Sequence, residues 1–223
     1  VLSHGGTPGR RMQRADKAWL AVLLACLVAL FWKVIFTSEM FYYRDVFNYT
    51  YPHARLIQEV CRGGQLPYWN PYLNYGQAVL ANPNFLFFYP DTLLLVLLPV
   101  DFAYTFHYLV HFALAGIGTY LLARQWEQTP TAAFFAAFFF ALSGPVLSLG
   151  NFYNQVAAAA WIPWALLATS RALDARSWRA WAAVTTVFAL QFLAGEPFTL
   201  MATFGLAVAY AFFQRGSFER PLG

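Results

Sequence analysis

The 223-residue chain contains 60% hydrophobic, 20% aromatic and only 11% charged residues. So few charged residues cannot cover the surface of a water-soluble domain of this length. The formal net charge of +4 does not indicate nucleic-acid binding, because the basic residues lie in short segments between apolar runs, where they report membrane topology. Cys26 and Cys61 lie at different depths of the expected bundle, so no disulfide is predicted.

Apolar runs predict an all-α polytopic transmembrane helix bundle. Crossing a hydrocarbon core of roughly 30 Å takes about 20 helical residues, and about six runs approach that length. They span residues 19–36, 102–123, 131–149, 153–170, 179–194 and 198–213.

The apolar run 85–99 is the ambiguous case. Pro90 interrupts it and leaves Asp91 to cap a helix of about eight residues, roughly 12 Å long, which is too short to cross. If this run does not cross, the clusters of basic residues all fall on the cytoplasmic side. These are Arg10, Arg11, Arg14, Lys17, Arg124, Arg171, Arg176, Arg179, Arg215 and Arg220.

The charge pattern therefore predicts the order of segments along the chain. A cytoplasmic basic N-terminus (1–18) precedes the first span (19–36), a long extracytoplasmic loop (37–101), five further spans (102–214) and a cytoplasmic tail (215–223). A cleaved signal peptide is the alternative for the first span, but its apolar stretch is long and no small-residue cleavage site follows. We expect the chain to be a fragment of a longer protein.

The long outer loop is expected to be ordered and partly helical. Apolar Leu56, Ile57 and Val60 alternate with polar neighbours at a spacing that predicts a short amphipathic helix on the membrane surface. Many prolines and aromatic residues follow between positions 66 and 90, whereas a flexible linker would be rich in Gly and Ser.

The usual catalytic signatures are missing: no phosphate-binding glycine loop, zinc-spaced Cys/His set, nucleophile elbow or HExxH motif occurs. Asp45 is the leading candidate, because it follows the first span at a depth where a charge is costly unless paired or used. It could act as a general base on an acceptor hydroxyl or hold a divalent cation against a phosphate leaving group. The alternative is that it pairs with Arg44 or caps the next helix.

Three further polar residues lie in turns on the same predicted face. Glu196, between Gly195 and Pro197, is a candidate second carboxylate, or else a solvated acid in a tight turn. Asn151 and Asn154 belong to a polar rim that could hydrogen-bond a sugar, although ordinary helix capping also explains them.

His107 and His111 are one helical turn apart near the outer end of the second span, so they share a helix face. They could bind a phosphate or a metal. Two hydrogen-bonded histidines between packed helices are the alternative.

Several short motifs resemble the first outer loop of bacterial YfhO-like membrane proteins, which are similar to the GT-C superfamily of glycosyltransferases. In the outer loop they are Arg44-Asp45, Tyr51-Pro52, Gly64-Gln65-Leu66-Pro67, Trp69-Asn70-Pro71-Tyr72, Gly76, Ala81-Asn82-Pro83 and Phe88-Tyr89-Pro90. Later positions with the same likeness are His111, Leu114-Ala115-Gly116, Tyr120-Leu121-Leu122-Ala123-Arg124, Trp161-Ile162-Pro163 and Ala194-Gly195-Glu196-Pro197.

The resemblance implies transfer of a sugar from a polyprenyl-phosphate carrier to a glycan, lipid or protein acceptor, outside the bacterial cytoplasmic membrane. It implies that an acid in the first outer loop, here Asp45, is catalytic or coordinates a divalent cation such as Mg or Mn. Glu196 is expected to be the second catalytic acid. Substrate contacts are expected from polar and aromatic residues of the same face: Arg44, Tyr51, His53, Trp69, Asn70, Asn82, His107, His111, Asn151 and Asn154.

Two other classes of function remain open. A transporter or flippase for a lipid-linked saccharide usually has polar or broken helices at the membrane midplane, whereas these span interiors are almost wholly apolar. A noncatalytic membrane subunit would use the aromatic loop to bind a partner. Members of the resembling family are much longer than this chain.

Overall fold

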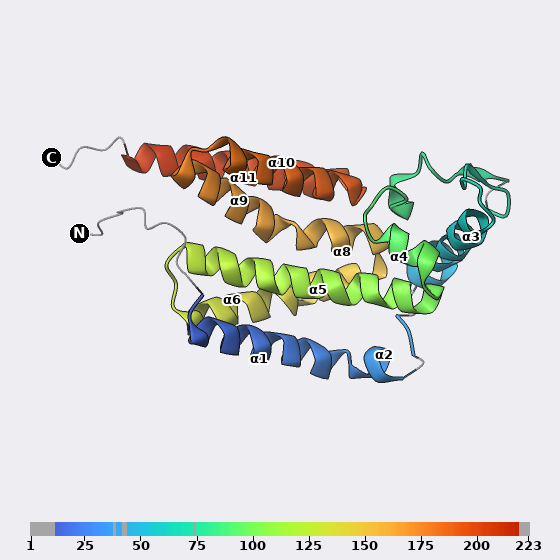
Figure 1. Cartoon of the computed structure of the whole chain (residues 1–223), viewed down its shortest axis with the longest axis horizontal. Helices are drawn as coiled ribbons and strands as arrows, with labels where there is room; N and C mark the ends of the chain where they lie inside the picture. The colour runs from blue at the N-terminus through green and yellow to red at the C-terminus, as the bar shows by residue number, and fades with distance from the viewer. Residues whose placement is uncertain (1–11, 38, 42–43, 74, 219–223) are drawn as a thin grey trace.

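The computed structural model describes residues 12–37, 39–41, 44–73 and 75–218. Arg10, Arg11 and Arg220, which the charge argument places in the cytoplasm, lie outside the described residues, as do the side chains of residues 215–218. Nearly all described residues belong to helices and their connections, which confirms the all-α prediction, and the long helices run side by side (Figure 1).

The elements follow one another in a simple order. The chain forms α1 (Arg14–Leu30), α2 (Trp32–Phe36), the π-helical turn η1 (Val46–Thr50), α3 (Tyr51–Arg62), β1 (Trp69–Asn70), β2 (Gln77–Ala78), the 3-10 turn η2 (Pro83–Phe85), α4 (Thr92–Leu97), α5 (Val100–Gln125), α6 (Pro130–Ala141), α7 (Gly144–Ser148), the 3-10 turn η3 (Leu149–Asn151), α8 (Tyr153–Ala160), α9 (Ile162–Ala175), α10 (Trp178–Leu193) and α11 (Pro197–Phe218). Strands β1 and β2 pair antiparallel, with Trp69 opposite Ala78 and Asn70 opposite Gln77.

Four helical segments are long and apolar enough to cross a membrane, which indicates a membrane protein. They are Val100–Gln125, Pro130–Asn151, Tyr153–Ala175 and Pro197–Gln214. The second and third segments are interrupted just before α7 and α9. Pro145 and Pro163 lie in the first turns of these two helices, where a proline is tolerated. Helices α1 and α10 have 17 and 16 residues, so six crossings and their direction stay predictions.

Helix α5 is the centre of the bundle and contacts α1, α3, α4, α6, α8 and α9. Small residues permit these close approaches. A Cβ atom on Gly118 would lie 2.5 Å from the indole nitrogen of Trp164, so no larger residue fits there. On α6, Ala133, Ala137 and Ala141 recur every fourth residue and are fully buried.

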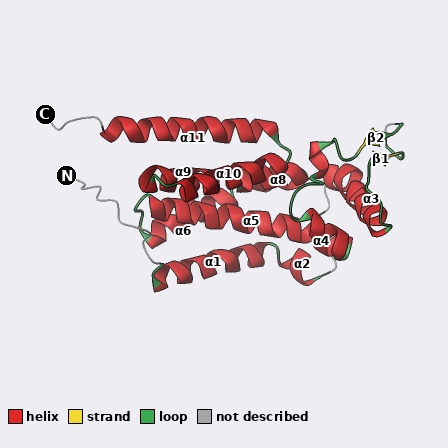
Figure 2. Cartoon of the chain, turned by 45° about the horizontal axis from the view of Figure 1, so that its top comes forward, coloured by secondary structure: helices red, strands yellow, loops and turns green. Residues whose placement is uncertain are grey.

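The segment between α2 and α5 covers one end of the bundle, which we call the loop end (Figures 1 and 2). The predicted amphipathic helix is confirmed as α3, with Ile57 buried and Glu59 exposed. Arg62 donates hydrogen bonds to the carbonyls of Val96 and Leu98 at the end of α4. Because α4 has six residues and is roughly 9 Å long, it cannot cross a membrane, as predicted.

Candidate functional site at the loop end

Asp45 immediately precedes η1 and is half-buried. Its side chain does not cap η1, and its carboxylate forms no hydrogen bond or ion pair with any residue that the structure describes. The neighbouring Arg44 is exposed, with a left-handed backbone of φ 38°. Neither of the two structural roles considered for Asp45, pairing with Arg44 or capping the next helix, is therefore formed.

A cavity of about 170 Å³ borders the turn that follows Asp45, although Asp45 itself is not among its lining residues. It is lined by Val46, the residue after Asp45, and by Phe41, Phe112 and Asn151, among others. The cavity thus brings Asn151, from η3, to the same space as the turn that carries Asp45. Its walls are mostly aromatic and aliphatic.

Tyr51 joins α3 to the first turn of α5. Its hydroxyl donates to Oδ1 of Asp101 and accepts a hydrogen bond of 3.1 Å from Nε of Arg55. Burial and the hydrogen bond to Asp101 raise the pKa of Tyr51. Thr50 likewise hydrogen-bonds Tyr104 of α5. The turn that follows Asp45 is therefore fixed to a spanning helix, while the Asp45 carboxylate has no hydrogen-bond or ion-pair partner in the part of the chain that the structure describes.

His53 and Asn70, both predicted to bind substrate, bind each other inside the loop. Nδ1 of His53 lies 2.6 Å from the Tyr49 carbonyl and therefore donates to it, whereas Nε2 accepts a 3.0 Å hydrogen bond from Asn70. The side-chain Oδ1 of Asn70 accepts a hydrogen bond from the backbone N–H of Tyr72. Burial lowers the pKa of His53, which agrees with a neutral ring.

Trp69 and Asn82 occupy different parts of the loop. Trp69, on β1, is exposed over more than half of its surface. Asn82 caps η2 through Oδ1, which accepts from the backbone of Asn84, and its Nδ2 donates to the Tyr49 hydroxyl. Asn82 is thereby held at the rim of a second cavity, described below.

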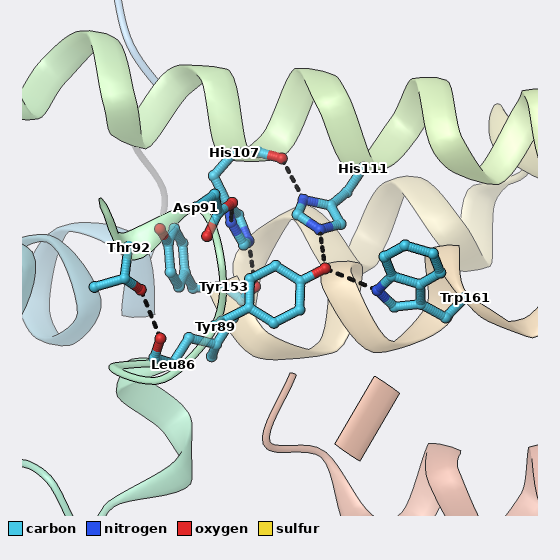
Figure 3. A network of polar contacts seen from close by, with 8 residues as sticks. All are labelled: Leu86, Tyr89, Asp91, Thr92, His107, His111, Tyr153 and Trp161. Carbon is cyan, nitrogen blue, oxygen red and sulfur yellow. Dashed lines mark hydrogen bonds and ion pairs between the residues drawn. The ribbon is translucent and has the colours of Figure 1, made fainter. Parts of the chain in front are cut away.

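A buried polar network fixes the loop to α5 and α8 (Figure 3). Nδ1 of His107 lies 2.5 Å from Oδ2 of Asp91, and Nε2 lies 2.8 Å from the carbonyl of Tyr153. Trp161 donates to the Tyr89 hydroxyl, which lies 2.8 Å from Nε2 of His111. Asp91 is the N-cap residue of α4, as predicted, but its carboxylate makes no cap hydrogen bond and binds His107 instead.

The partners determine which atoms of the network donate. Both partners of His107 are acceptors, so both of its ring nitrogens act as donors and the ring forms an ion pair with Asp91. His111 donates from Nδ1 to the carbonyl of His107 and accepts at Nε2 from Tyr89. Burial would raise the pKa of Asp91, but the charge and hydrogen bond of His107 outweigh it and hold that pKa below its usual value.

Asp91, His107 and His111 offer ligand atoms within 4.8 Å of one another, a spacing that suits a metal ion. However, all four ring nitrogens already have hydrogen-bond partners, and a ring that donates from both nitrogens has no lone pair for a metal. Among the polar side-chain atoms of these three residues, only Oδ1 of Asp91 has no hydrogen-bond partner in the described part of the chain. The arrangement favours a structural role, and we call it the Asp91–His107 clip.

Glu196 lies at the start of α11 and is 9% exposed. Its Oε2 accepts a 2.5 Å hydrogen bond from the backbone of Thr199, so it caps the helix. Glu196 also lines a cavity of about 390 Å³, together with Asn82 and several apolar residues. We call this cavity the Glu196 pocket; it lies between residues 80–88, the end of α10 and the start of α11.

The turn that carries Glu196 packs against the loop. Gly195 has φ +70°, and a Cβ there would lie 2.1 Å from the carbonyl oxygen of Pro83. Asn154 donates to Oδ1 of Asn84 at 3.0 Å and to the Gly195 carbonyl at 3.4 Å. Asn154 therefore fixes one side of the Glu196 pocket, whereas Asn151 lines the smaller cavity that includes Val46.

The candidate residues thus fall into separate groups and do not form one cluster. Three residues that form side-chain hydrogen bonds at the loop end were assigned no functional role from the sequence: Asp91, Tyr89 and Asp101. The signal for Asp91 was available, since an acid within an apolar stretch needs a partner. Comparison of this chain with protein-family models, curated proteins and solved structures finds no match.

Proposed function

We propose that the chain belongs to a membrane glycosyltransferase of the GT-C type, which transfers a sugar from a polyprenyl-phosphate carrier to a cell-envelope acceptor on the outer face of the membrane. The motifs of the outer loop that resemble YfhO-like proteins support the proposal. The observation that carries it is that the Asp45 carboxylate at the loop end has no partner among the described residues, in a segment whose neighbouring side chains are bound to α5.

In the proposed reaction Asp45 is the general base. Its carboxylate takes the proton of the acceptor hydroxyl while that oxygen forms a bond to the anomeric carbon of the sugar. The bond between this carbon and the carrier phosphate breaks, and the phosphate leaves with the electron pair. General base catalysis contributes typically 10²- to 10⁴-fold, which gives the size of the effect expected from Asp45.

A divalent cation would help the phosphate to leave by neutralising its charge. Mg²⁺ is commonly held by one or two carboxylates together with substrate phosphate oxygens, and Asp45, whose carboxylate has no partner among the described residues, is suited to that role. The exposed guanidinium of Arg44 is the adjacent group that can contact a phosphate.

The test is Asp45→Asn in the full-length protein, reconstituted in liposomes with a polyprenyl-phosphate sugar and membrane acceptors. We expect transfer to fall at least about 100-fold, because Asn cannot accept the proton. Glu59→Gln removes an exposed carboxylate from α3 of the same loop and is the matched control. If Asp45→Asn retains transfer, Asp45 takes no part in the mechanism. If the lipid-linked sugar crosses the bilayer without a glycosidic product, the protein is a transporter and the proposed transferase function is wrong.

A further inference from the structure

The Glu196 pocket has the size of a ligand site, at about 390 Å³. Most of its wall is apolar and includes Leu86, Phe88, Phe192 and Leu200. Glu196 and Asn82 are the polar side chains that line it, and its described lining contains no Lys, Arg or His. The pocket therefore combines a large apolar surface with one carboxylate that no basic residue of the lining balances.

The polar groups of the pocket retain unused hydrogen-bonding capacity. Oε2 of Glu196 is occupied by the backbone of Thr199, but Oε1 has no partner among the described residues. Nδ2 of Asn82 donates one hydrogen to Tyr49 and has a second hydrogen available. An acceptor and a donor on one lining match a hydroxyl group, which both donates and accepts. A phosphate would be repelled by Glu196. An ammonium group would be attracted to Glu196 but has no acceptor for the second amide hydrogen of Asn82, which a hydroxyl group does have.

The pocket also borders a surface suited to hydrocarbon chains. Phe88 and Phe192 line it and are 64% and 68% exposed. Next to it, Phe198 and Met201 are exposed on α11, within a segment long and apolar enough to cross a membrane. In a bilayer these side chains meet lipid, so a lipid tail can lie on them while its head group occupies the pocket.

We propose that the Glu196 pocket binds a lipid with a neutral, hydroxylated head group, such as a glycosyl diacylglycerol, and that Oε1 of Glu196 accepts a hydrogen bond from one of its hydroxyls. Binding of this lipid does not depend on the proposed function; only a further role for the lipid as the sugar acceptor would rest on that function. The pocket selects against anionic head groups because Glu196 is the unbalanced charge in its lining.

The experiment measures photo-crosslinking in nanodiscs by two lipids with the same diazirine-bearing chains, monoglucosyl diacylglycerol and phosphatidylglycerol. We expect the glucosyl lipid to label residues 80–88 and 192–200 saturably, to be displaced by its unlabelled form, and to exceed phosphatidylglycerol in labelling. Equal labelling by the two lipids would overturn the proposal. So would stronger labelling of these residues by a matched phosphatidylethanolamine probe, because it would identify a cationic occupant.

Glu196→Gln is the decisive variant, since its amide oxygen can still accept from Thr199 and keep the helix cap. We expect roughly tenfold weaker binding of the glucosyl lipid, the loss of one hydrogen bond to a charged group, and increased labelling by phosphatidylglycerol. Unchanged preference between the two lipids would contradict the proposal. Monodisperse elution and an unchanged unfolding temperature show that the variant is folded.

A second pair of variants tests the position of the site. Leu200→Trp fills the pocket and should abolish labelling, whereas Leu206→Trp on the same helix faces away from the lining and should not. Persistent labelling in Leu200→Trp would place the lipid elsewhere. Selective lipid binding without sugar transfer would support this site while contradicting the proposed enzyme, so the two proposals fail separately.

Discussion

Oδ2 of Asp91 lies 2.5 Å from Nδ1 of His107, and this ion pair links the loop before α4 to the central helix of the bundle. The His107 side chain is fully buried and that of Asp91 is 13% exposed. Together with Tyr89 and Trp161, the clip determines how the loop sits on the spanning helices (Figure 3). A buried charge pair therefore helps to fix the loop end on the bundle.

Asp91→Asn should destabilise the protein strongly, because it leaves the charge of His107 without its counter-charge. Removing one partner of a buried pair typically costs about 3–5 kcal/mol. The free energy of unfolding, measured by denaturant titration in detergent micelles, checks this. Glu59→Gln, an exposed acid in the same loop, is the control, and a loss in Asp91→Asn no larger than in this control would show that the clip contributes no stability.

Asp16 forms a second buried pair, at the opposite end of the bundle. Its Oδ1 accepts hydrogen bonds of 2.7 Å from Arg124 and 2.8 Å from Tyr120, so it ties α1 to α5. We expect Asp16→Asn to cost about 3–5 kcal/mol in the same unfolding measurement. The pair of Lys33 and Glu39 is the contrast, since both side chains are 59% exposed at 4.0 Å, and Glu39→Gln should cost less than about 1 kcal/mol. Equal losses in the two variants would refute the comparison.

Acidification should loosen the loop end through His53. Burial lowers the pKa of His53 in the fold below its ordinary value of 6.5, so the unfolded loop binds the proton more readily than the folded loop. Stability is therefore fully present above pH 6.5 and is lost as the pH falls toward the lowered pKa. Protonation also directs an N–H of His53 against the amide hydrogens of Asn70.

Hydrogen exchange of residues 49–70, followed from pH 7.5 to pH 5 and corrected for intrinsic exchange rates, measures this loosening. His53→Gln keeps a polar side chain but cannot titrate, so its exchange should not depend on pH in this window. A variant that loosens with acid as much as the original protein would show that another group is responsible.

Gly195→Ala should separate the α10–α11 turn from the loop. Alanine disfavours φ +70°, and its Cβ would lie 2.1 Å from the Pro83 carbonyl oxygen, so we expect a loss of more than about 1 kcal/mol. Gly205→Ala is the matched control within α11, where a Cβ meets nothing within 4 Å and should stabilise the helix by about 0.5–1 kcal/mol. Thermal unfolding distinguishes the two, and equal effects would contradict the close contact at Pro83.

The sequence was sufficient to predict those features of the fold that depend on neighbouring residues in the chain. Apolar runs and their lengths predicted the helical membrane architecture, and Pro90 limited the helix that follows Asp91 to one too short to cross. The spacing of Leu56, Ile57 and Val60 predicted α3, because helical periodicity depends only on neighbouring residues.

Only the tertiary structure decided which polar groups are bound and which are free. His53 and Asn70 share the loop with Asp45, yet they hydrogen-bond each other while the Asp45 carboxylate has no partner among the described residues. The partner of His107 lies 16 residues earlier in the chain, and no local pattern specifies that contact. Composition and periodicity determine which segments are buried, whereas the packing of distant segments against α5 determines which donors and acceptors meet, and hence where a ligand can bind.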